Sequence, residues 1–162
     1  MNGLRFVFLF LGLAVLWQGC QGKSADSLFV EGEQATHDMA SYPVAEAKLS
    51  EFIEQYPDDP RADVALQALA RVLMNQKKNK EAIDRYETLI TDFPQSRYCA
   101  QAQFMIGYIY DQLGDEDQAK KAYQKLIDTY PKSELVDDAK ISIQNMGKTP
   151  GQWLFPKSVS QQ

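Results

Sequence analysis

The sequence LIDTYPKS at residues 126–133 has a near copy, LITDFPQS, at residues 89–96, and a more diverged copy, FIEQYPDD, at residues 52–59. Pro57, Pro94 and Pro131 follow one another at intervals of 37 residues, and alanines 45, 82 and 119 keep the same interval. Self-similarity at such a period is typical of chains built from structural units that stack on their neighbours. The sequence therefore predicts a single repeat domain.

Each unit is predicted to contain two helices. In EAIDRYETLITDF (81–93) the apolar residues recur at helical spacing and form one stripe. The proline that follows disfavours helical backbone at the residue before it, so this helix should end near Phe93. Asp59, Ser96 or Ser133 comes two residues after each proline and is expected to accept from backbone N–H groups where the next helix starts, with Pro60 as a first helical residue.

The first residues do not fit a globular domain. Phe6 to Trp17 is an uninterrupted apolar run of 12 residues, whereas a membrane-spanning helix needs about 20. The run has the layout of a secretory signal. LWQGC (16–20) resembles the cleavage site of bacterial lipoproteins, which implies a signal peptide at 1–19, lipid on Cys20 and a short tether through residue 26. The alternatives are an ordinary secreted protein cut near Gly19 and an uncleaved anchor.

Composition argues against several functions. The formal net charge is −5, which disfavours nucleic-acid binding. The sequence contains one histidine, His37, and no Gly-rich phosphate loop or Cys/His ligand spacing. We therefore expect no enzyme activity, no cofactor and no metal. Cys99 lies in an apolar helical pattern and is expected to be a small buried residue.

The third unit carries the motif of a known family. Ile106-Gly107, Tyr110, Ala119, Tyr123 and Pro131 stand at the spacing of the tetratricopeptide repeat, with Gln103 in place of the usual tryptophan. The resemblance implies an all-α solenoid of about three helix pairs plus a C-terminal helix, over residues 27–146. The first unit keeps Phe29, but Gly32, Glu33 and Thr36 do not fit its pattern.

Small and aromatic residues in this register are expected to pack the helix pairs. Larger side chains at the small positions would overpack the helix crossing. The predicted packing residues are Ala70, Ala82, Gly107, Ala119 and Tyr123, with Pro94 and Pro131 at the joints.

The repeat is three residues longer than the standard repeat of about 34. That period, with Tyr/Phe-Pro-x-Ser at each joint, resembles the BamD/YfiO outer-membrane assembly lipoproteins and the C-terminal domain of the YbgF/CpoB proteins of the Tol-Pal system. The resemblance implies a non-catalytic scaffold anchored to the periplasmic face of the outer membrane, with outer-membrane assembly components as partners. A Tol-Pal and peptidoglycan-linked coordinator, or a soluble periplasmic adaptor, are the alternatives.

In the tetratricopeptide repeat the first helix of each pair lines a concave face that holds peptides or partner helices. By register, the second unit contributes Gln67, Arg71, Met74 and Asn75, and the third contributes Phe104, Tyr108, Asp111 and Gln112. Gln34, His37 and Asp38 would continue the row in the first unit, and Ile141 and Asn145 in the last helix. Phe104 is a candidate for core packing as well.

The C-terminal segment 147–162 loses the helical period. Trp153, Leu154 and Phe155 are too apolar for a polar tail. They are expected either to cover the end of the stack or to dock to a partner.

Overall fold

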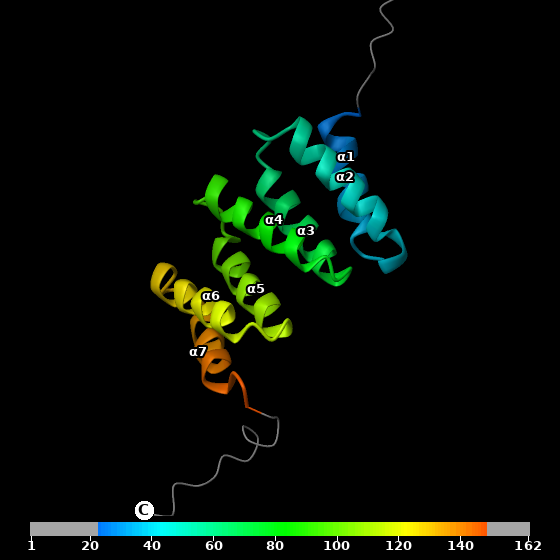
Figure 1. Cartoon of the computed structure of the whole chain (residues 1–162). Coiled ribbons are helices and arrows are strands. Elements are labelled where there is room, and N and C mark those ends of the chain that lie inside the picture. Colours follow the sequence, from blue (N-terminus) through cyan, green and yellow to red (C-terminus); the bar gives the residue numbers. More distant parts are fainter. Residues whose placement is uncertain (1–22, 149–162) are drawn as a thin grey trace, which may run out of the picture.

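A computed structural model describes residues 23–148 as a stack of helices (Figure 1). Within that range the elements are α-helices and a short 3₁₀ helix, without strands. In chain order they are α1 (Ala25–Ala35), η1 (Met39–Ser41), α2 (Tyr42–Gln55), α3 (Ala62–Asn75), α4 (Asn79–Asp92), α5 (Cys99–Gln112), α6 (Glu116–Thr129) and α7 (Leu135–Asn145). The predicted all-α solenoid of three helix pairs and a final helix is confirmed.

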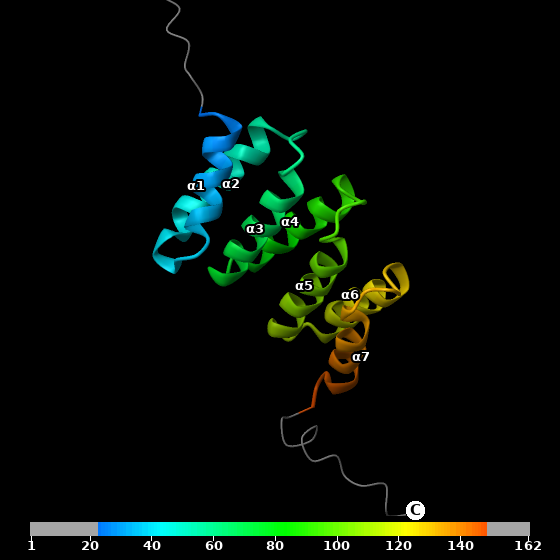
Figure 2. The same ribbon diagram turned by 180° about the vertical axis from the view of Figure 1, so that it is seen from behind.

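The helices pack as consecutive pairs: α1 on α2, α3 on α4, and α5 on α6. The second helix of each pair also packs on the first helix of the next, and α7 packs on α6. Figure 2 shows from behind that α7 lies at the opposite end of the stack from α1. Contacts are therefore made mainly between neighbours, as expected of a solenoid.

The joints between units follow the predicted chemistry. The helices before the three prolines end in C-caps at Tyr56, Phe93 and Tyr130, each of which donates its N–H to a carbonyl four residues back. After each proline, the side chain of Asp59, Ser96 or Ser133 accepts from the backbone N–H two residues later, at 2.9, 3.2 and 3.2 Å. The prediction for Pro60 is wrong, because α3 begins at Ala62 and Pro60 lies in the turn before it.

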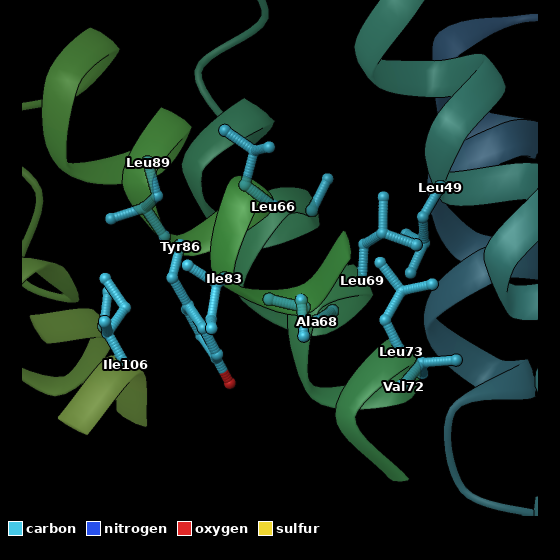
Figure 3. Packing of buried hydrophobic residues seen from close by; sticks show 14 of the residues in the cluster. Leu49, Leu66, Ala68, Leu69, Val72, Leu73, Ile83, Tyr86, Leu89 and Ile106 are labelled. Carbon is cyan, nitrogen blue, oxygen red and sulfur yellow. The ribbon is translucent and has the colours of Figure 1, made fainter. Parts of the chain in front are cut away.

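The core runs through the stack along the facing sides of the helices. Figure 3 shows Leu69 and Leu73 of α3 turned toward Leu49 of α2, while Tyr86 of α4 lies toward Ile106 of α5. A second, smaller cluster joins α6 to α7 around Tyr123 and Leu126. The predicted small residues Ala70, Ala82 and Ala119 are all fully buried.

Gly107 lies at a close helix crossing of the third unit. A Cβ atom at this position would lie 2.7 Å from the Tyr123 ring of α6, which is closer than packed atoms approach. Gly107 is also buried. In the structure, α5 and α6 thus approach each other closely at Gly107 and Tyr123.

The first unit is regular, but its register is displaced by one residue. Gly32 is buried, and a Cβ there would lie 2.8 Å from Leu49. Gly32 therefore lies at the crossing of α1 and α2, as Gly107 lies at the crossing of α5 and α6. Leu28, rather than Phe29, is the fully buried residue of this helix. The interval from Gly32 to Ala70 is 38 residues rather than 37. The extra residue lies between α1 and α2, where η1 forms.

Arg61 ties the first helix to the first joint. Its guanidinium donates to both carboxylate oxygens of Asp59 at 2.8 Å and to Asp26 of α1 at 2.7 Å. The guanidinium also lies over the Phe29 ring, 4.9 Å from its centroid. The hydrogen bonds from Arg61 lower the pKa of Asp59 to about 2.

This lowered pKa predicts an acid-dependent loss of stability. An unfolded aspartate titrates near about 4, so the stabilisation from Asp59 is complete above that pH and is lost as pH falls through about 2. We expect the melting temperature to fall between about pH 4 and pH 2, and Asp59→Asn to flatten that decline. Asp58→Asn, at the exposed neighbour, is the control for thermal melts followed by circular dichroism. An unaltered acid profile in Asp59→Asn would contradict the assignment.

Candidate functional site

The predicted concave-face residues lie along α3 and α5 at helical spacing, as their register requires. Their side chains divide into an exposed group and a half-buried group. Arg71, Asn75, Tyr108 and Gln112 are exposed, whereas Gln67, Met74, Phe104 and Asp111 are half-buried. Tyr108 is 39% exposed.

Half of these residues surround one pocket, which we call the α3/α5 pocket. It has a volume of about 210 Å³. Its lining comprises Met74 and Asn75 of α3, Lys77 in the turn that follows, Asn79 at the start of α4, and Tyr108, Ile109 and Gln112 of α5. The structure therefore brings Met74, Asn75, Tyr108 and Gln112 together, as a partner-binding face requires, whereas Gln67, Arg71, Phe104 and Asp111 do not line this pocket.

Lys77, Asn79 and Ile109 were not predicted as site residues. Lys77 adopts φ of 64° in the turn between α3 and α4, and Gly114 adopts φ of 74° in the turn between α5 and α6. These two positions are 37 residues apart. The glycine at position 114 could therefore have indicated a similar turn at Lys77 in the preceding unit. The turn brings Lys77 and Asn79 to the end of the α3/α5 pocket.

Two of the predicted residues are held by the first unit. The Asn75 side-chain amide donates to the Tyr42 hydroxyl at 3.0 Å, and Arg71 donates weakly to the Thr36 hydroxyl at 3.4 Å. Thr36 itself is buried and donates to the Glu33 carbonyl. These contacts orient Asn75 and Arg71 before any partner binds.

Of the three residues predicted for the first unit, only Gln34 lies on α1, where its side chain is exposed. Helix α1 ends at Ala35, so His37 and Asp38 lie beyond it. Asp38 instead accepts from the Ala40 N–H at 3.1 Å and caps η1. The reason is that α1 ends at Ala35, which corresponds to Leu73 at the 38-residue interval, whereas α3 continues to Asn75. At the other end, Ile141 of α7 is exposed and Asn145 is half-buried.

Phe104 packs within the stack. Its ring lies 5.3 Å from the Tyr123 ring, centroid to centroid, and it belongs to the cluster between α6 and α7. Of the two roles predicted for Phe104, this contact supports core packing.

The described residues offer little chemistry for catalysis. Between residues 23 and 148, no three His, Cys, Asp or Glu side chains gather as a metal site would need. Cys99 is buried as predicted, its thiol donates to the Phe93 carbonyl at 3.2 Å, and burial raises its pKa. A raised pKa disfavours the reactive thiolate.

Within the same range, no helix has the length and apolar character needed to cross a membrane. The predicted signal peptide, Cys20 and Trp153–Phe155 lie outside the described residues.

The stacked helix pairs define a helical-repeat protein, and the α3/α5 pocket lies between the first helices of two neighbouring pairs. A family model described as tetratricopeptide repeat-like domain matches residues 27–147, and the chain belongs to that family. A solved tetratricopeptide repeat protein from Parabacteroides merdae is similar, with 17% identity and a TM-score of 0.40, over 77% of this chain and 60% of that one. This chain therefore spans less than two thirds of the solved protein. No curated protein matches it significantly.

Repeats of this family generally mediate protein–protein interactions, and the family is typically a non-catalytic scaffold. The fold thus suggests protein partners for this chain.

Proposed function

We propose that this chain is a lipid-anchored, periplasm-facing scaffold in bacterial outer-membrane assembly, of the BamD-like kind, and that it holds a partner segment in the α3/α5 pocket. The observation that carries the partner-binding part is the convergence of Met74, Asn75, Tyr108 and Gln112 on one pocket. The anchoring part rests on the sequence around Cys20. The outer-membrane role rests on the period and joints of the repeat.

The chemistry of the α3/α5 pocket suits an extended peptide. The amides of Asn75, Asn79 and Gln112 can each donate and accept, as a peptide backbone requires. Met74 and Ile109 add apolar surface for one small side chain, and Tyr108 offers an exposed ring of the kind enriched at interfaces. Lys77 is the single charged residue of this lining. The pocket therefore favours an uncharged or weakly acidic segment.

The position of α1 fits an anchor close to the domain. Ser24 accepts from the Ser27 N–H and caps α1, which begins at Ala25. Four residues, 21–24, then separate Cys20 from the first helix, so the Cα atoms of Cys20 and Ala25 lie at most about 18 Å apart. The repeat domain would consequently be held at the membrane surface. Mass spectrometry of membrane fractions tests the anchor, and an unmodified Cys20 in soluble mature protein would refute it.

Tyr108→Ala tests the binding face. We expect about tenfold weaker capture of the partner after cross-linking, because exposed interface tyrosines often contribute more than 1 kcal/mol. The melting temperature should stay within about 2 °C of the parent chain, since surface substitutions change stability little. Capture is measured by quantitative mass spectrometry of the cross-linked species.

Leu113→Ala is the matched control, because Leu113 is also an exposed apolar residue at the end of α5 but does not line the pocket. Equal capture by Tyr108→Ala and the control would contradict the proposed face. Recovery of Tol-Pal proteins in place of outer-membrane assembly subunits would favour the alternative coordinator function.

A further inference from the structure

The turn between α3 and α4 has the same backbone hydrogen bonds as the turn between α5 and α6. In the first turn the N–H of Lys77 donates to the carbonyl three residues back, and the N–H of Lys78 donates to the carbonyl five residues back, both at 2.9 Å. Gly114 and Asp115, 37 residues later, make the same two bonds at 3.0 Å each. Both turns lie at the edge of the stack opposite the joints (Figure 1). The two turns therefore differ in their side chains rather than in their geometry.

The side chains of the α3–α4 turn are unfavourable for local stability. Lys77 has φ of 64°, a left-handed conformation that glycine adopts readily and lysine does not. Lys78 is the N-cap residue of α4 and makes no side-chain cap hydrogen bond. In the other turn, Gly114 takes the left-handed position, and Asp115 caps α6 by accepting from the Gln118 N–H at 3.1 Å. The α3–α4 turn lacks both of these stabilising residues.

Lys78 is held by the first unit instead. Its ammonium group donates to both carboxylate oxygens of Glu46 in α2, at 2.6 and 2.7 Å. The pair is partly exposed, and partly exposed ion pairs add little to stability. Lys78 lies between Lys77 and Asn79 in the chain, and both of these line the α3/α5 pocket. Glu46 therefore holds in place the segment that completes the pocket.

Lys77 is the single charged residue that lines the α3/α5 pocket. Within residues 23–148, its ammonium group takes part in no ion pair. A lysine ammonium carries three donors and no acceptor, so it can bond a carbonyl or carboxylate oxygen of a bound segment. Backbone conformations that are costly for the residue concerned cluster at binding and active sites. A lysine in this conformation beside the pocket therefore indicates a role in binding.

We propose that the α3–α4 turn is a binding element formed at the expense of local stability. Lys77 contacts the partner segment in the α3/α5 pocket, and Glu46 is a positioning residue that acts through Lys78. This inference rests on the function proposed for the pocket and assigns two further residues to it. A glycine and an aspartate would form the same turn more stably, as Gly114 and Asp115 do. They would also remove the ammonium group from the pocket and leave Glu46 without its partner.

Copying the α5–α6 turn into unit two tests the proposal. In the double variant Lys77→Gly, Lys78→Asp we expect the melting temperature to rise by about 3 °C, because glycine relieves the left-handed backbone and aspartate caps α4. Capture of the partner should nevertheless become about fivefold weaker, through loss of the lysine contact. If the turn were merely structural, a more stable turn would leave capture unchanged or raise it.

Capture is measured on the full chain with a photo-activated cross-linking residue in place of the exposed Lys80, which follows the pocket residue Asn79. An amine-reactive reagent is unsuitable, because its yield would change with each lysine removed. The cross-linked species is quantified by mass spectrometry. The matched control is the reverse exchange, Gly114→Lys, Asp115→Lys. It should lower the melting temperature by about 5 °C and leave capture unchanged, since neither residue lines the pocket.

Glu46→Gln tests the positioning role separately. The melting temperature should stay within about 2 °C of the parent chain, because the ion pair is partly exposed. Capture should become about threefold weaker, since the turn is no longer held. The exchanged pair Glu46→Lys, Lys78→Glu should recover the capture lost in Glu46→Gln. Glu54→Gln is the control, because Glu54 is an exposed residue of the same helix.

Three results would overturn the proposal. The first is unchanged capture by Lys77→Gly, Lys78→Asp although Tyr108→Ala lowers it, which would show that the pocket binds without the turn. The second is a lower melting temperature in the same double variant, which would show that the lysines stabilise the turn. The third is unchanged capture by Glu46→Gln. Equal capture by Tyr108→Ala and its own control would contradict the proposed function, and this inference with it.

Discussion

Replacing Gly107 with leucine is expected to lower the melting temperature by about 10 °C, because overpacking a core contact costs up to about 3 kcal/mol. Even the first carbon of a side chain at this position would meet the Tyr123 ring at 2.7 Å. Tyr123 is itself fully buried and packs against Phe104, so its ring has little room to move. Thermal denaturation followed by circular dichroism at 222 nm is the measurement.

Gln101→Leu provides the control for Gly107→Leu, since Gln101 is exposed on the same helix. It introduces the same side chain without a clash and should change the melting temperature by less than about 2 °C. The double variant Gly107→Leu, Tyr123→Ala should recover part of the loss, because it removes the ring that the leucine meets. An unchanged melting temperature in Gly107→Leu would contradict the assignment of the α5–α6 crossing.

Replacing Tyr86 with alanine should have the largest effect of any single substitution in the central unit. Tyr86 is 1% exposed and lies in the core, turned toward Ile106 of the next unit (Figure 3). Truncation of a buried aromatic residue costs about 3–5 kcal/mol, which corresponds to roughly 15 °C in melting temperature for a domain of this size. Because Tyr86 connects units two and three, a single cooperative transition should also become broader.

Tyr86→Phe is the control, and it carries a prediction about alkaline pH. Burial raises the pKa of Tyr86 to about 12, whereas an unfolded tyrosine ionises near about 10. The contribution of Tyr86 to stability is therefore complete below about pH 10 and is lost as pH rises through about 12. Tyr86→Phe should melt close to the parent at neutral pH and decline less above pH 10. Tyr123, whose pKa burial also raises to about 12, should account for part of the remaining decline.

The fold was predicted well because the residues that recur every 37 positions are the same residues that end and begin the helices. Each joint needs a proline to end one helix and an Asp or Ser oxygen to begin the next, and these residues recur visibly at 37-residue intervals. The small residues at the crossings were predictable for the same reason. The register failed only in the first unit, where Gly32 packs one position away from the repeat column. A single added residue near η1 leaves the hydrophobic pattern similar but changes which side chain faces the partner helix.

The candidate site was predicted less completely. The register placed Met74, Asn75, Tyr108 and Gln112 on one face, because helix spacing fixes which residues share a face, and these four residues line the α3/α5 pocket. It could not show that Lys77 and Asn79 complete the α3/α5 pocket, since a turn places them there rather than a helical period. Gln103 appeared in the sequence only as a missing tryptophan. In the structure its Nε2 donates to the Ala122 carbonyl of α6, while its Oε1 has no hydrogen-bond partner among the described residues. These contacts depend on how two helices pack, which the sequence alone does not show.

The charged outer side of α7 bears on whether copies of this chain can grow into filaments. A helical stack is open at both ends, so a copy could in principle add head to tail without closing a ring. Exposed apolar side chains occur on the first helix pair at Val30, Met39 and Val44, whereas α7 exposes chiefly charged and amide groups. Within residues 23–148, the two ends of the stack are therefore not complementary. We expect this mismatch to stop polymerisation even at high protein concentration.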